Sequence, residues 1–92
     1  MKSVACFVHH LSKTPEALMS LNSHFYVLHN SESQRYKVKA QYGYPGTVHF
    51  AVFEEQNLLA ITDESHKLVN FYRLNDVVAN KVDFPKGAYK TQ

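Results

Sequence analysis

Six histidines stand out in this 92-residue chain, because imidazole is the commonest side-chain ligand for metal ions. Their local spacing argues against a metal site. Cys6 and His10 share one face of a predicted strand but lie about 13 Å apart along it, whereas one ion needs both ligand atoms about 2 Å away. A site would have to combine distant strands, for example His9 with His49. The sequence therefore predicts no metal and no other cofactor.

A hydrolytic site is the second chemistry that the residue types suggest. Residues Asp63-Glu64-Ser65-His66 include a hydroxyl, an imidazole and two carboxylates, but four consecutive residues in one polar loop rarely place the base between nucleophile and carboxylate. Glu54 and Glu55 point to opposite sides of a strand end and do not pair for acid–base work. Cys6 is expected to be buried within an apolar run and unreactive. We predict no catalytic residues and no enzyme activity.

The stretch Arg35–Gly46, RYKVKAQYGYPG, interleaves three cations with three tyrosines, as nucleic-acid-binding surfaces do. On an alternating strand, however, the cations face away from Tyr36 and Tyr42, so bases stacked on those rings could not place their phosphates on the cations. A solvated edge strand is the favoured explanation. The alternative is RNA binding by a small protein of the endoribonuclease-toxin kind. Its residues would be Arg35, Lys37, Lys39 and Tyr44, with a histidine such as His66.

A β-hairpin is the element around which the rest of the chain is predicted to fold. Residues 48–53 and 58–61 are apolar runs on either side of the polar tetrad 54–57. Both faces of the first run are largely apolar, which favours a strand in the middle of a sheet. Residues 3–10 show the same two-sided pattern, and we place them inside the sheet too.

A helix is predicted to follow the first strand and to cover the sheet. Thr14-Pro15-Glu16 has the residue types of an N-cap, a first helical position and a first-turn acid. The stripe facing the sheet would be Leu18, Leu21, Phe25 and Leu28. The helix either runs to about residue 30, or ends at 22–23 and gives way to a strand over 24–29. The second version is slightly favoured, and periodicity leaves both open.

The remaining predicted elements are short. Residues 35–42 alternate cationic and apolar side chains, which predicts an edge strand protected by lysines, and 43–46 form a tight turn. A strand is predicted over 67–74, and one or two helical turns over 77–80. The tail, 81–92, shows no periodicity and is predicted to be extended.

Composition completes the prediction of fold class. Ninety-two residues, 45% of them apolar, fit a single α+β domain over 1–92: an antiparallel, meander-like sheet of about five or six strands covered by one N-terminal helix. The single cysteine, and a sequence without a signal-peptide or membrane-span pattern, predict a cytoplasmic protein. The net charge of +2 permits an acidic partner without requiring one.

The function predicted from these features is that of a small binding module that acts through protein contacts. Strands that are apolar on both faces need a helix or a second subunit to cover them, which predicts self-association, as in a homodimer. Nucleic acid is a less favoured partner, and no membrane partner is predicted. A third hypothesis is a ligand pocket between helix and sheet, although a solid core is favoured there. That pocket would be lined by Leu21, Phe25, Phe50 and Val52.

Overall fold

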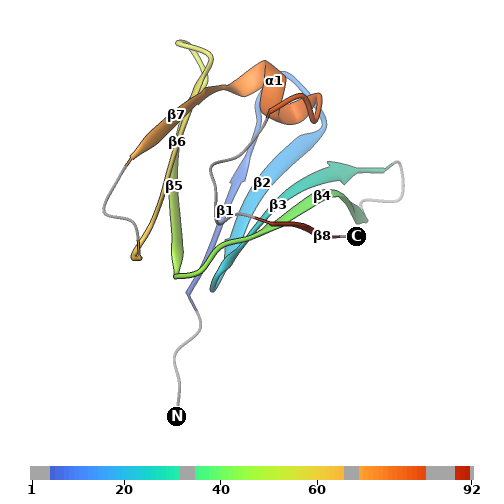
Figure 1. Ribbon diagram of the computed structural model, residues 1–92. Helices are drawn as coiled ribbons and strands as arrows, with labels where there is room; N and C mark the ends of the chain where they lie inside the picture. Colours follow the sequence, from blue (N-terminus) through green and yellow to red (C-terminus); the bar gives the residue numbers. More distant parts are fainter. Residues whose placement is uncertain (1–4, 32–34, 66–68, 83–88, 92) are drawn as a thin grey trace.

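The described part of the chain forms two antiparallel β-sheets and one short helix (Figure 1). The computed structural model describes residues 5–31, 35–65, 69–82 and 89–91. The first sheet is a four-stranded meander with a short strand added at one edge; its strands in spatial order are β1 (Cys6–His10), β2 (Glu16–Leu21), β3 (His24–Asn30), β4 (Tyr36–Gly43) and β8 (Tyr89–Thr91). The second sheet contains β5 (Val48–Phe53), β6 (Leu58–Asp63) and β7 (Asn70–Arg73). Helix α1 (Leu74–Val78) follows β7 and lies across one end of the two sheets (Figure 1).

The hydrophobic core lies between the two sheets and is closed at one end by α1. Each sheet turns one face inward, so alternate residues of each strand reach the core. From the first sheet come Leu18, Phe25, Val27, Ala40 and Tyr42; from the second sheet and α1 come Val48, Leu59, Ile61, Leu74 and Val77. Tyr44, in the connection between the sheets, is buried with them.

The predicted N-terminal helix is wrong, and with it the α+β fold class: the structure is mostly β, and its helix is a single turn near the C-terminal end. Residues 16–21 form strand β2, which pairs with β3 through a two-residue turn at Asn22-Ser23. Asn22 adopts the left-handed conformation, with φ of 53°, that such a tight hairpin turn requires. The helix therefore does not form, and the alternative strand over 24–29 does.

The apolar stripe of that helix is split between two faces of the sheet. In the observed register Leu18 and Phe25 point into the core, whereas Leu21 and Leu28 lie on the opposite face. Spacings of three, four and three residues fit a helix, but the same residues fit two strands once a turn intervenes. Pro15 sits in the β1–β2 turn, where its missing N–H costs no ladder hydrogen bond, and its carbonyl accepts from the Asn30 amide.

Two strands expected in the interior of a sheet lie at its edges instead. β1 is an edge of the first sheet, and its residues are mostly exposed, Cys6 included. β5 is an edge of the second sheet, where β6 is the central strand. The hairpin itself is confirmed: Val48 pairs with Asp63 at one end and Phe53 with Leu58 at the other.

A β-bulge in β4 changes which side chains of the basic strand are covered. Val27 pairs with Ala40, but the next residue of β3, Leu28, pairs with Val38, so Lys39 is the extra residue. The bulge reverses the alternation that the sequence predicts. Tyr36 and Val38 are consequently 41% and 56% exposed, although they were expected to be buried. The predicted strand over 67–74 is found in part, as β7 over 70–73, and Leu74 begins α1 instead.

Candidate functional site

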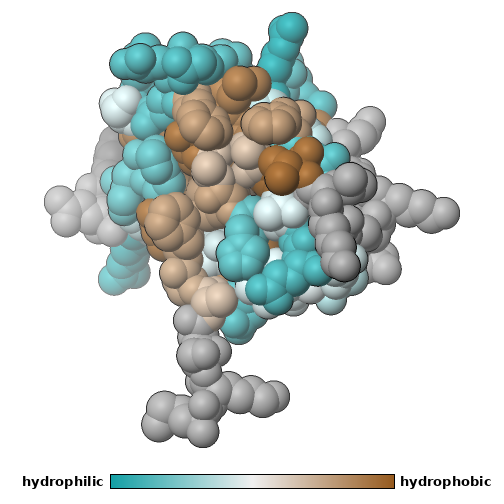
Figure 2. All heavy atoms as spheres, turned by 90° about the vertical axis from the view of Figure 1, so that its left-hand side faces the viewer, coloured by the Kyte–Doolittle hydropathy of each residue, from teal (hydrophilic) through white to brown (hydrophobic). Residues whose placement is uncertain are grey.

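The outer face of the second sheet carries the largest exposed side chains of that sheet. We define this outer face by the residues that alternate with the core residues of β5, β6 and β7, together with Val69: His49, Ala51, Phe53, Leu58, Ala60, Thr62, Val69, Phe71 and Arg73. Phe53, Val69 and Phe71 are 46%, 58% and 61% exposed. Figure 2 views the molecule from this side and shows an apolar area in the middle, with polar side chains above and below it.

A shallow hollow lies beside the most exposed of these side chains. Ala51, Ala60 and Phe71 form one row across the three strands, so two small side chains adjoin a large one. The alanines form the floor of a hollow of about 230 Å³ whose walls include His49 and Val69. The outer face thus has an exposed ring, that of Phe71, in the same row as the two alanines that line the hollow.

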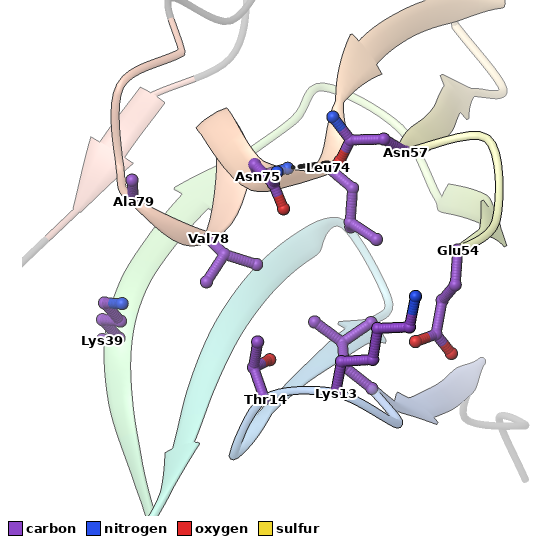
Figure 3. Close-up of a pocket in the computed structure, with 10 residues that line it drawn as sticks. Lys13, Thr14, Lys39, Glu54, Asn57, Leu74, Asn75, Val78 and Ala79 are labelled. Atoms are coloured by element: carbon purple, nitrogen blue, oxygen red, sulfur yellow. Dashed lines mark hydrogen bonds between the residues drawn. The ribbon is translucent and has the colours of Figure 1, made fainter.

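A second cavity, the end pocket, opens at the end of the sheets where α1 lies (Figure 3). Its volume is about 340 Å³. The β1–β2 turn, the bulge of β4, the β5–β6 turn and α1 each supply part of the wall. Apolar residues of the lining include Leu11, Leu74 and Val78, and its charged residues are Lys13, Lys39 and Glu54.

The β5–β6 turn holds the walls of the end pocket together through Glu54 and Asn57. One Glu54 oxygen accepts hydrogen bonds of 2.9 Å from the Ser12 amide and hydroxyl, and the other lies 3.1 Å from Nε2 of His9. The backbone and side-chain bonds from Ser12 and the bond from His9 lower the pKa of Glu54 to about 2. Its carboxylate therefore joins the β5–β6 turn to β1 and to the turn that follows it.

Asn57 joins the same turn to the start of α1. Its side-chain oxygen accepts from the Asn75 amide at 2.9 Å, the bond drawn in Figure 3, and its carbonyl accepts from the Leu74 amide at 3.0 Å. Arg73, at the N-cap position, provides no side-chain cap. Asn57 thus caps α1 although it lies outside the helix, in the β5–β6 turn. Its backbone is in the left-handed conformation, with φ of 56°.

The predicted nucleic-acid residues are not gathered on one surface. Arg35, Lys37 and Lys39 are exposed, and the Lys39 ammonium lies 3.5 Å from the buried Glu16 carboxylate. Tyr44 is only 7% exposed, and burial among its neighbours raises the pKa of its hydroxyl. Its ring is therefore closed to a stacking base, unlike the exposed turn residue that the alternative required. RNA binding by the basic strand stays a prediction.

The histidines lie in separate pairs rather than in one cluster. His9 contacts Glu54, His29 contacts Glu16, and His49 lies 3.3 Å from Glu64. His10 Nδ1 is 2.7 Å from the Tyr36 hydroxyl. Within the described ranges, no three His, Cys, Asp or Glu side chains are placed to hold one metal ion. His66, from the loop with triad-like residue types, lies outside the described residues.

Neither cavity is the ligand pocket that the sequence suggested. Phe25 is fully buried, and its ring lies 5.4 Å from the ring of Phe50, so these two side chains pack as core. Leu21 faces the opposite side of the first sheet. The end pocket was missed because its walls come from turns far apart in sequence.

In the described part of the chain, no helix is long and apolar enough to cross a membrane. Comparison of the chain with protein-family models, curated proteins and solved structures finds no match.

Proposed function

We propose that the protein is a small protein-binding module that forms a homodimer through the outer face of the second sheet. The observation that carries this proposal is the exposure of Phe53, Val69 and Phe71 on a single face. Side chains of this kind scattered singly need no partner, but a contiguous group of them on one sheet face marks an interaction surface. The inner face of the same sheet is already covered by the first sheet.

A second copy is the partner because the outer face is complementary to itself. In this dimer two copies stack face to face about a twofold axis that runs parallel to the strands, between β6 and β7. Because Phe71 and Ala60 are register partners on these strands, Phe71 of each copy lies opposite Ala60 of the other. Phe71 of each copy then lies over the alanine-floored hollow of the other. A benzyl group has seven carbons, and at no more than about 30 Å³ for each it needs less than about 210 Å³. The hollow holds about 230 Å³.

The size of the face predicts a weak dimer. The strands β5 and β6 have six residues each and β7 has four, so at a spacing of about 4.8 Å they present a face of at most roughly 14 by 20 Å. That area is well below the roughly 800 Å² that each partner contributes to a standard interface. Burying the exposed 61% of Phe71, out of about 200 Å², contributes about 3 kcal/mol per copy at 25 cal/mol per Å². The two copies together gain about 6 kcal/mol, less the cost of association, so we expect a dissociation constant of roughly hundreds of micromolar.

Light scattering on a concentration series of Phe71→Asp and Val38→Asp tests the proposal. Both residues are exposed and apolar, 61% and 56%, but Val38 lies on the first sheet. The wild type and Val38→Asp are expected to approach twice the 10.6 kDa of one chain at about 1 mM, and Phe71→Asp to remain a monomer. Equal dimerisation of the two variants would refute the assigned face. Circular dichroism of each variant confirms that it is folded.

A further inference from the structure

We propose that the end pocket binds a small aliphatic carboxylate, with its carboxylate at Lys13 and its hydrocarbon part against Leu11, Leu74 and Val78. This site is separate from the outer face and involves none of its residues. The two sites occupy different parts of the molecule, so each can fail without the other.

The size of the pocket sets the size of the ligand. Its 340 Å³ lies within the range of small-molecule sites, at the lower end. At about 30 Å³ for each water-sized group, such a volume holds roughly ten non-hydrogen atoms. Octanoate has about that size, and its chain would cover the apolar part of the lining.

One cation of the lining is placed to receive an anion. The charged residues of the lining are Lys13, Lys39 and Glu54. Both oxygens of Glu54 already accept hydrogen bonds from Ser12 or His9, and Lys39 lies beside Glu16. Lys13 forms no ion pair with a carboxylate of the described residues. Its side chain extends from the β1–β2 turn, and its ammonium ends between Leu74 and Glu54 (Figure 3), so it is the cation that a ligand carboxylate would meet.

The pocket is also held in shape before a ligand arrives. Asn57 fixes the start of α1, and Glu54 fixes the β1–β2 turn, so three of the four walls are joined by hydrogen bonds through one turn. A site that is already formed loses less conformational entropy on binding than one that must be ordered by the ligand.

Titration with octanoate, followed by NMR of the wild-type chain, tests the proposal. Octanoate is expected to bind with a dissociation constant of roughly 0.1 to 1 mM and to shift the methyl signals of Leu74 and Val78. Lys13→Gln should weaken binding about fivefold, as expected for a partly exposed ion pair, whereas the matched control Lys37→Gln leaves it unchanged. Lys37 is exposed and lies outside the pocket lining. Val78→Phe should fill the pocket and abolish binding.

Any of four outcomes would overturn the proposal. The first is octanoate binding that is equally strong in Lys13→Gln and Lys37→Gln. The second is a chemical-shift change that maps to Phe71 and the outer face instead of α1. The third is equal binding of 1-octanol, which lacks the charge, or of inorganic phosphate, which lacks the apolar chain. Absence of any shift at about 10 mM octanoate would also refute it.

Discussion

Replacement of Asn57 tests whether one turn residue positions α1. The Asn57 side-chain oxygen accepts a hydrogen bond from the Asn75 amide, and the Asn57 backbone has φ of 56°. Asn57→Ala loses the capping bond, at a cost of about 1 kcal/mol, and adds left-handed strain of about 1 kcal/mol. We expect a total loss of about 2 kcal/mol in the free energy of unfolding, or about 8 to 16 °C in Tm for a domain of this size.

Two further variants separate the two contributions. Asn57→Gly removes the cap without the left-handed penalty, so we expect a loss of about 1 kcal/mol. Asn57→Asp keeps a side-chain acceptor near the start of a helix and should stay within about 0.5 kcal/mol of the wild type. Urea unfolding followed by circular dichroism measures all three. If Asn57→Ala and Asn57→Asp were equally stable, the capping role assigned to Asn57 would be wrong.

Two other substitutions test contacts that shape the fold. The pKa of Glu54 is lowered to about 2 from an ordinary 4.5, so its charged form stabilises the fold above about pH 4.5, and this stabilisation is lost as the pH falls toward 2. Thermal melts should therefore show the advantage of the wild type over Glu54→Gln shrinking across that range, and a constant difference would contradict this. Gly46→Ala places a methyl group 2.5 Å from Oγ and 3.0 Å from the amide nitrogen of Ser65, so we expect a loss of about 1 to 3 kcal/mol in urea unfolding. Ser65→Ala in the same chain should recover part of it, because it removes the hydroxyl contact.

The hairpin was predictable because its information is local. Residues 48–53 and 58–61 each form a continuous apolar run, and the polar tetrad between them fits only a turn. The absence of the N-terminal helix could not be predicted, because Thr14-Pro15-Glu16 and the apolar spacing after it fit a helix as well as two strands. What decided between them is the pairing of β2 with β3, which places Leu18 beside Val27. The core that this hairpin joins includes Leu59 and Ile61, which are distant in sequence.

The two candidate sites differ in how far the sequence could reveal them. The two-sided apolar pattern of 48–53 indicated that something must cover each face, and the structure covers only the inner one. The sequence therefore indicated that this strand has a second apolar face in need of cover, but it did not indicate that Phe71 is exposed there. The end pocket left no local pattern, because Lys13, Glu54 and Val78 belong to different turns and to α1. Only the fold brings them together.

Self-association through the outer face is tested most directly by a dilution series of amide NMR spectra from about 1 mM to about 20 μM. We expect concentration-dependent shifts at Ala51, Ala60 and Phe71, with the signals of β2 and β3 unchanged. Spectra that do not change with concentration, or changes confined to the first sheet, would contradict it.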